Sequence, residues 1–149
     1  MSYTADKIHD RLYQGGLPPG GDGLAKSGID VLVLCAKEWQ DASQYEGLTV
    51  ICAPGDDDHR LHRLMRFIDS WKDAAHQVAE HVKAGRTVLV TCMQGLNRSG
   101  IVTAMALQEI TGMHGEAIVE HVQSRRQDAL CNSTFAQYII ETYPKTEVL

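Results

Sequence analysis

The chain has 149 residues, 44% of them hydrophobic, which suits one domain with a substantial core and leaves too little chain for two. Its formal net charge of −5 argues against a broad basic surface for nucleic acid or an anionic membrane. No apolar run approaches the roughly 20 residues that span a bilayer, and the N-terminal segment lacks the apolar region of a secretory signal.

The first third of the chain predicts three strands. The segment 7–16 reads as a short strand, and a Pro/Gly-rich loop with one helical turn follows it up to Gly28. The continuous apolar runs 29–36 and 48–53 are typical of strands that are buried on both faces.

A long amphipathic helix is predicted over 61–84, because apolar residues recur there at a spacing of three and four. Gly85 supplies its C-terminal stop. The predicted apolar face consists of Leu61, Leu64, Met65, Ile68, Trp71, Ala75, Val78 and Val82.

The remaining segments complete an alternation of strands and helices. A third buried strand is predicted over 86–91, and helices over 99–112, 114–126 and 133–143, the last with Ser133 as its N-cap. Buried strands that alternate with helices predict an α/β fold: a single domain over 1–149, with a mainly parallel central sheet flanked by helices and joined by right-handed crossovers.

The segment VTCMQGLNRSG, residues 90–100, lies between the third buried strand and the helix after it. Ligands of open α/β sheets bind at such a turn, where backbone N–H groups and the helix dipole attract an anion. Gly95 presents no Cβ to obstruct a ligand, and Arg98 offers a two-pronged donor for phosphate oxygens. The same field stabilises the thiolate of Cys92, which is then a nucleophile placed for in-line attack on phosphorus.

The pattern C-x5-R-S from Cys92 to Ser99 resembles the signature of the cysteine-dependent protein tyrosine phosphatases, and the small size resembles their dual-specificity branch. The resemblance extends to RLYQGGLPP, similar to the first strand of that branch, and to STFAQYIIETY, similar to its closing helix. It implies that Cys92 forms a thiophosphate intermediate, that Arg98 clamps the phosphate and that Ser99 assists release of the sulfur, without metal or organic cofactor. The implied substrate-binding loop consists of Met93, Gln94, Gly95, Leu96, Asn97 and Arg98.

Thr91 departs from the pattern of the family, which usually has histidine directly before the cysteine. A hydroxyl forms hydrogen bonds but has no ring and no titratable proton. We therefore expect slower catalysis or a more alkaline optimum than is usual for the family, and still expect catalysis.

The resemblance also implies a general acid on a loop after an earlier strand, and Asp56, Asp57 and Asp58 lie there. The acid of related proteins often stands three residues after a proline that closes the strand, so Pro54 points to Asp57. The other two aspartates stay open as alternatives. Another interpretation is a solvated acidic turn in which Asp58 caps the following helix.

Other candidate groups have plainer interpretations. His62 and His76 are expected on an exposed or half-buried helix flank, and no set of His, Asp and Glu has the i, i+4 spacing of a zinc site. Arg125 and Arg126 either bind a second phosphate on the substrate or interact favourably with the helix dipole near a helix C-terminus. The cysteines outside the loop lack a disulfide pattern, which indicates a reducing, cytoplasmic setting, and are expected to pack as small apolar residues: Cys35, Cys52 and Cys131.

The loop between Cys92 and Arg98 contains no lysine and no second arginine, which argues against polyanionic inositol lipids as substrates. A phosphorylated protein is expected instead, with phosphotyrosine and also phosphoserine or phosphothreonine. Three alternatives remain: an RNA 5′-triphosphatase, with which Asn97 is compatible; a rhodanese-like sulfurtransferase; and a phosphate-binding module with little or no turnover. The acidic net charge disfavours the first, and the aspartate triplet would have no role in the second.

Overall fold

The computed structural model describes residues 3–38 and 40–146. The predicted strand over 7–16 is wrong in one respect, because this segment is a hairpin of two antiparallel strands, β1 (Asp6–His9) and β2 (Leu12–Gly15). Arg11 adopts a left-handed backbone with φ of 62° and turns the chain between them. β2 is also paired with the rest of the central sheet on its other side, and its C-terminal end leads to the Pro/Gly-rich loop.

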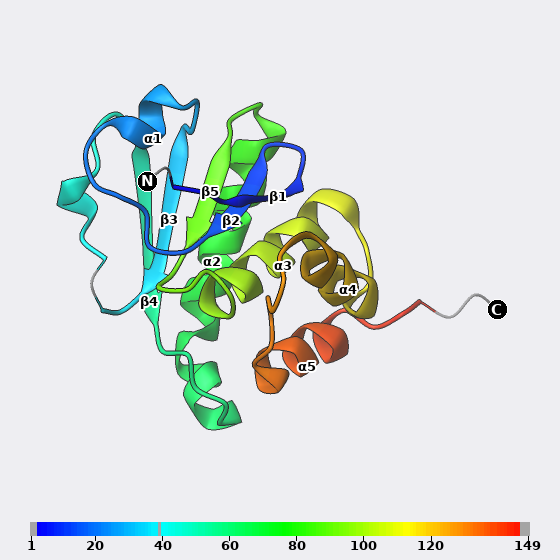
Figure 1. Ribbon diagram of the computed structural model, residues 1–149. Coiled ribbons are helices and arrows are strands. Elements are labelled where there is room, and N and C mark those ends of the chain that lie inside the picture. The colour runs from blue at the N-terminus through cyan, green and yellow to red at the C-terminus, as the bar shows by residue number, and fades with distance from the viewer. Residues whose placement is uncertain (1–2, 39, 147–149) are drawn as a thin grey trace.

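The central sheet has the strand order β1-β2-β5-β3-β4 (Figure 1). All pairs except the β1–β2 hairpin are parallel, so the predicted mainly parallel sheet is confirmed. β3 (Val31–Ala36), β4 (Thr49–Gly55) and β5 (Val88–Thr91) begin one or two residues later than predicted, and β4 runs on to Gly55. Since these strands are parallel, their C-terminal ends meet at one edge of the sheet.

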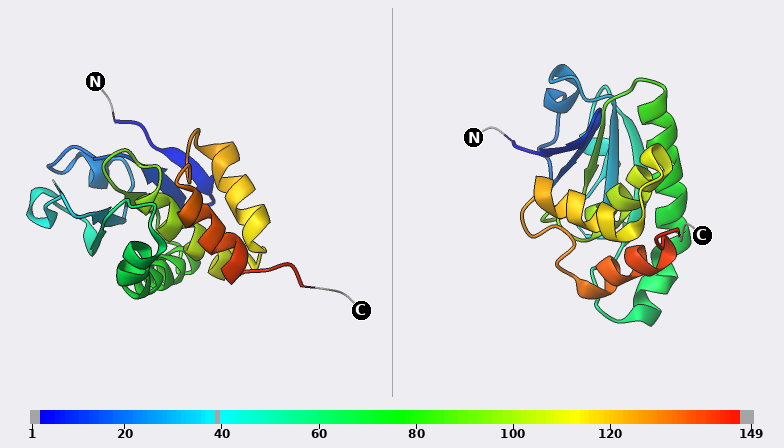
Figure 2. Two further views of the ribbon diagram at one scale, coloured as in Figure 1. Left: turned by 90° about the horizontal axis from the view of Figure 1, so that it is seen from below. Right: turned by 90° about the vertical axis from the view of Figure 1, so that its right-hand side faces the viewer.

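The four long helices lie on one side of the sheet, three of them against its face and the C-terminal one against two of the other helices, and the opposite face carries only short elements (Figure 2). The turn predicted before Gly28 is the short helix α1 (Gly23–Lys26), and a 3-10 turn, η1 (Ala42–Gln44), was not predicted. The long helices agree with the predicted bounds to within one residue: α2 (Leu61–Lys83), α3 (Arg98–Thr111), α4 (Gly115–Arg125) and α5 (Ser133–Thr142).

β3 shows why the buried strands read as continuous apolar runs. Val31, Val33 and Cys35 belong to the core beneath the long helices, whereas Leu32 and Leu34 belong to a second core on the α1 side. Successive side chains of a strand point to opposite faces, so a strand covered on both faces needs apolar residues at every position. The runs that predicted the strands thus reflect a two-sided core.

The predicted apolar face of α2 is partly wrong. Leu61 is 59% exposed and Met65 is 50% exposed, whereas Leu64, Ile68 and Trp71 are buried as expected. Figure 1 shows that the start of α2 extends beyond the edge of the sheet, so the first turns have no core beneath that stripe. The helical spacing was correct, but it could not indicate where the sheet ends.

The N-cap of α5 is Asn132 and not the predicted Ser133. Asn132 Oδ1 accepts hydrogen bonds from the backbone N–H groups of Thr134 at 3.1 Å and Phe135 at 3.4 Å. Asparagine and serine are about equally good N-caps, so the sequence offered two adjacent candidates. The position matters because the other side of the Asn132 amide points toward the candidate site.

Within residues 3–38 and 40–146, no helix combines the length and the apolar character needed to cross a membrane.

Candidate active site

A pocket of about 300 Å³ lies where β3, β4 and β5 end. It brings together the predicted nucleophile, the predicted phosphate clamp, one of the three candidate acids and most of the predicted substrate loop. It also contains a residue that the sequence analysis did not identify, Glu38. The lining residues are Glu38, Asp57, Cys92, Met93, Gln94, Leu96, Asn97 and Arg98.

The loop from Met93 to Leu96 has its carbonyl oxygens bonded to the surrounding scaffold. Leu17 N donates to Met93 O at 3.0 Å, and Leu130 N donates to Leu96 O at 2.9 Å. Two buried or half-buried side chains hold the carbonyls between them: Gln14 Nε2 donates to Gly95 O at 2.8 Å, and Arg126 donates to Gly95 O from Nε at 2.7 Å and to Gln94 O from Nη2 at 3.0 Å.

This arrangement fixes the direction of the loop's N–H groups. No peptide bond among the described residues is cis, and in a trans peptide the C=O of one residue and the N–H of the next point in opposite directions. Because the carbonyls of residues 93–96 point outward, the N–H groups of residues 94–97 point toward the interior of the loop. With the N-terminus of α3 behind them, they form a concave array of donors of the kind that binds phosphate.

Gly95 is required for a different reason than predicted. Its φ is +74°, and a Cβ there would lie 2.3 Å from the carbonyl carbon of Gly15 and 2.5 Å from the nitrogen of Gly16. The obstructed neighbour would therefore be the end of β2 and not the ligand, and Gly95 is absent from the pocket lining. Glycine lets the loop pack directly against the backbone of the neighbouring strand.

Arg98 has five N–H donors on three nitrogens, and its contacts in the structure involve the two Nη nitrogens. Nη1 donates to Glu38 Oε2 at 3.0 Å and to Gly55 O at 3.1 Å, and Nη2 lies 2.7 Å from Glu38 Oε1 in an ion pair. Nε is buried without a partner, and Nη2 retains a second hydrogen. The guanidinium therefore keeps one complete edge, Nε–H with Nη2–H, for a two-pronged contact with an oxyanion.

The contact between Glu38 and Arg98 shifts the pKa of both side chains. Burial lowers the pKa of Arg98, but the hydrogen bond to Glu38 and the neighbouring Cys92 raise it by more, so its pKa lies above the ordinary value. The hydrogen bonds from Arg98 hold the pKa of Glu38 below its ordinary value. Both partners are therefore charged at neutral pH.

Cys92 is buried at the base of the pocket, and its Sγ lies 3.3 Å from the Oγ of Ser99. The hydroxyl is thus close enough to donate a hydrogen bond to the sulfur when the sulfur is a thiolate. Cys35, at the end of the adjacent strand, is also buried, and burial raises the pKa of its thiol. The expectation that all other cysteines pack internally is wrong for Cys52 and Cys131, which are exposed.

The three aspartates after β4 have different partners. Asp56 binds Arg63 at 2.9 Å, and Asp58 binds Arg60, which holds the pKa of Asp58 well below its ordinary value. Asp57 alone of the three lines the pocket with Cys92 and Arg98. Asp58 accepts the N–H of Arg60 at 2.9 Å but does not cap α2, whose N-cap is Arg60 with no side-chain cap bond.

Thr91 takes part in a hydrogen-bonded chain that reaches Glu38's loop. Its hydroxyl donates to Val33 O at 2.8 Å and accepts from Gln40 Nε2 at 2.9 Å, while Gln40 Oε1 accepts from Ala36 N at 2.8 Å. Gln40 thereby fastens the segment after β3 to the end of β5. This segment is the one that carries Glu38 to Arg98.

Three residues that shape the pocket were missed or misread in the sequence. Glu38 had a usable signal, since it follows the buried strand 29–36 at the edge where Cys92 also lies. Gln14 had none, because a single polar residue in a strand does not reveal its partner. Arg126, considered as a second phosphate site or a dipole partner, instead donates to the loop carbonyls and to Asp6 Oδ2 at 2.9 Å.

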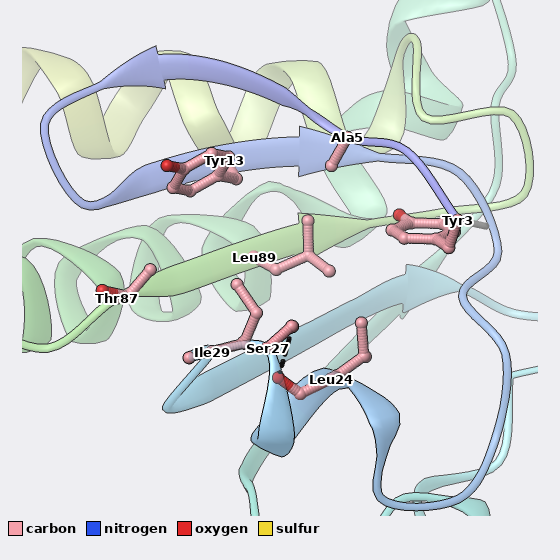
Figure 3. A pocket seen from close by; sticks show the side chains of 9 residues that line it. Tyr3, Ala5, Tyr13, Leu24, Ser27, Ile29, Thr87 and Leu89 are labelled. Carbon is pink, nitrogen blue, oxygen red and sulfur yellow. Dashed lines mark hydrogen bonds between the residues drawn. The ribbon is translucent and has the colours of Figure 1, made fainter.

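A second cavity, of about 360 Å³, lies on the α1 side of the sheet (Figure 3). Tyr13 and Leu89 line it from β2 and β5, and Leu24 and Ile29 face them. Tyr3 borders it and donates from its hydroxyl to Gly16 O at 2.9 Å, and burial raises the pKa of Tyr3 to about 12. No residue of the 92–99 loop lines this cavity, so it is separate from the pocket around Cys92.

Among the residues that the structure describes, no group of three or more His, Cys, Asp or Glu side chains is placed to hold a metal ion. His62 and His76 are exposed on α2, in agreement with the predicted helix flank. His76 pairs with Glu109 at 2.8 Å.

Comparison with known families gives one clear match. The sequence model of the family "Dual specificity phosphatase, catalytic domain" matches residues 12–145, which is most of the chain. A search of curated protein sequences finds no match.

Solved structures share the fold at low sequence identity. The crystal structure of human DUSP28 is 22% identical, with a TM-score of 0.72 over 92% of this chain and 96% of that one. The PTP-2 phosphatase of Cydia pomonella is 17% identical, with a TM-score of 0.77 over 99% and 94%. The human tyrosine phosphatase-like serine/threonine/tyrosine-interacting protein is 19% identical, with a TM-score of 0.71 over 93% and 94%.

Proposed function

The chain belongs to the dual specificity phosphatase family, and we propose that it hydrolyses phosphate monoesters on protein tyrosine, serine and threonine through a phosphocysteine at Cys92. The observation that carries this proposal is the set of N–H donors that the loop and Arg98 present beside Cys92. The N–H groups of residues 94–97 point toward the interior of the loop, and Arg98, whose buried Nε has no partner among the described residues, lines the same pocket as Cys92. A tetrahedral oxyanion satisfies all of these donors at once.

In the first proposed step, the thiolate of Cys92 attacks phosphorus on the side opposite the ester oxygen. The S–P bond forms as the P–O bond breaks, and Asp57 gives its proton to the leaving oxygen. The loop amides and Arg98 stabilise the charge on the three equatorial oxygens, which is the largest single contribution expected from this site.

In the second step, water attacks the thiophosphate and the S–P bond breaks. Asp57, now a carboxylate, takes a proton from the water, and inorganic phosphate leaves. The hydroxyl of Ser99, 3.3 Å from the sulfur, donates a hydrogen bond to the thiolate that is released. The cycle consumes the ester and water and restores Cys92. Because the nucleophile must remain a free thiol, the proposed setting is a reducing compartment such as the cytoplasm.

The charge of the rim favours a simple monoester over a polyphosphate. The pocket contains two carboxylates, Glu38 and Asp57, against the single guanidinium of Arg98. The side chain of Glu38 is 43% exposed, so its field reaches a ligand at the mouth. An inositol polyphosphate or a 5′-triphosphate would bring further negative charges next to these carboxylates, with no cation in the lining to bind them. We therefore favour a phosphorylated protein side chain.

The test is hydrolysis of 4-nitrophenyl phosphate, with EDTA present, by the wild type, Cys92→Ser and Cys52→Ser. We expect the wild type and Cys52→Ser, an exposed cysteine on β4, to be active, and Cys92→Ser to be inactive while it still binds a phosphotyrosine peptide. A wild type that binds phosphate but turns over no ester at any pH would contradict the proposed activity. It would favour a phosphate-binding module instead.

A further inference from the structure

Both carboxylate oxygens of Asp57 accept hydrogen bonds from side-chain amides of other elements. Asn97 Nδ2 donates to Oδ2 at 2.9 Å, and Asn132 Nδ2 donates to Oδ1 at 2.9 Å. The two asparagines are also joined, because the backbone N–H of Asn132 donates to Asn97 Oδ1 at 2.9 Å. The three residues form a closed ring that links the aspartate loop, the phosphate loop and the start of α5.

Asn132 is firmly held from its other side. Its Oδ1 caps α5, and its Nδ2 also donates to the carbonyl of Asp58 at 3.2 Å. Two residues earlier, Leu130 has a left-handed backbone with φ of 57°, which a leucine adopts only where its surroundings enforce it. Those surroundings are the bond from Leu130 N to Leu96 O and the contact of the leucine side chain with Gly100.

Asn97 relates the ring to the phosphate position. It directly precedes Arg98 in the chain, and its backbone N–H is one of the inward donors of the loop. Its side chain is 8% exposed, so it has little freedom to turn away from Asp57. Asp57 itself is exposed, and no close packing would otherwise orient its carboxyl group.

We propose that Asn97 and Asn132 are positioning residues that orient Asp57 for proton transfer to the leaving oxygen. This inference rests on the proposed function. The N–H groups of a side-chain amide only donate, so neither can take the acidic proton from Asp57. They bind lone pairs of its two oxygens and leave the proton for the ester oxygen. The ring thereby ties the acid to the same loop that holds the phosphate.

A merely structural role for Asn132 has to be separated from this one, because the residue also caps α5. Asn132→Ser and Asn132→Asp both retain good N-cap residues, so α5 is expected to persist. Both remove the amide that donates to Asp57, and Asn132→Asp adds a second carboxylate beside it. Gln137→Ala is the matched control, since Gln137 lies exposed on the same helix and its side chain donates to Glu141, away from Asp57.

The test compares two esters that differ in their need for an acid. Phenyl phosphate has a poor leaving group that must be protonated, whereas 4-nitrophenyl phosphate has a good one. We measure the release of the leaving group in the first turnover, which reports the first step alone. We expect both Asn132 variants to lose about 10-fold in this rate on phenyl phosphate, a part of the roughly 10²–10⁴ that a general acid contributes, and to change little on 4-nitrophenyl phosphate. Gln137→Ala should match the wild type on both esters.

Equal losses on the two esters, or no loss on either, would overturn the inference, because a positioning residue for the acid must act through the leaving group. Thermal melting of each variant shows that α5 is intact. A wild type that is inert on both esters would overturn the proposed function and this inference together, an outcome distinct from wild-type activity with unchanged variants.

Discussion

Glu38 binds one end of the Arg98 guanidinium. Its carboxylate contacts Nη1 and Nη2, so the buried Nε is left without a partner among the described residues. A guanidinium held in this way loses little further freedom when it binds a ligand, which is the advantage of arginine at two-pronged sites. Glu38 thus acts on the ligand through Arg98.

The lowered pKa of Glu38 gives a stability prediction with a definite sign. A carboxyl group whose pKa is lower in the folded state stabilises the fold above its unfolded pKa, and this contribution disappears as pH falls through the folded value. We expect the Tm difference between the wild type and Glu38→Gln to be constant from about pH 5.5 to about pH 8 and to shrink below about pH 4. Thermal melts across this range test it, and a difference that grows on acidification would contradict it.

Gly95 gives a prediction at the contact between the loop and β2. Gly95→Ala places a side chain at a residue with a positive φ. Its Cβ would also overlap backbone atoms of Gly15 and Gly16, which cannot move aside as a flexible side chain could. Gly85→Ala is the matched control, because Gly85 has a φ of +86° and open space around it. We expect Gly85→Ala to cost about 1–2 kcal/mol of unfolding free energy with activity retained.

For Gly95→Ala we expect a larger loss of stability than for Gly85→Ala, together with loss of phosphatase activity, because the donors of the loop would shift from their common centre. Chemical denaturation and hydrolysis assays on the two variants provide the comparison. Full activity in Gly95→Ala would contradict the tight packing of the loop on β2.

The sequence alone identified site residues that stand at a recognisable spacing from one another, and it missed those that come from distant segments. Cys92 and Arg98 stand six apart across a strand–helix turn, so one local pattern contains both. Glu38 and Asn132 come from segments that are 54 residues before and 40 residues after Cys92 (92 − 38 and 132 − 92). Only the pairing of β3 with β5 and the docking of the 126–132 segment on the loop bring them to the site.

At the scale of elements, Thr91 connects two neighbouring strand ends. The pairing of Leu34 with Thr91 places the segment after β3 beside the loop after β5, and the Thr91–Gln40 bond fastens it there. Thr91 is fully buried, so the histidine that is usual in the family would have to displace this contact. Threonine in place of the usual histidine is therefore accompanied by a hydrogen bond to Gln40.

Replacement of the Thr91 hydroxyl tests this connection. Thr91→Val leaves Gln40 Nε2 and Val33 O without their partner, and we expect a loss of about 1–3 kcal/mol in unfolding free energy. We also expect a higher KM for phosphate esters, because the segment that carries Glu38 would loosen. Thr91→Ser keeps the hydroxyl and serves as the control. If Thr91→Val matched Thr91→Ser in both stability and KM, the hydrogen bond between Thr91 and Gln40 would contribute to neither.

The strands and helices could be predicted from the sequence where a single pattern of apolar residues ran through the whole element. The two-sided core around β3 produced unbroken apolar runs, and the long helices gave clear spacing. The hairpin was read as one strand because its turn at Arg11 contains no glycine or proline signal. The exposed Leu61 and Met65 were assigned to the core because helical spacing does not tell where the neighbouring sheet stops.

At the scale of the whole molecule, the proposed anion site belongs to a chain with a net charge of −5. Backbone amides and one guanidinium supply the attraction, so no broad basic surface is needed. The composition argues against a broad basic surface, and it cannot reveal a site made of neutral N–H groups. Those groups converge because scaffold donors from β2, the segment after α4 and the loop after β2 hold the carbonyls outward.

The most direct test of a covalent mechanism at this site is detection of the phosphocysteine itself. With 4-nitrophenyl phosphate, whose leaving group needs no acid, Asp57→Asn should leave the first step nearly unchanged and slow the hydrolysis of the intermediate, which should therefore accumulate. After rapid acid quenching, mass spectrometry of the intact protein and its peptides should find one added phosphoryl group, located on Cys92 and absent from Cys92→Ser. Turnover of the ester with no such adduct at any time point, or an adduct on another residue, would contradict the proposed role of Cys92.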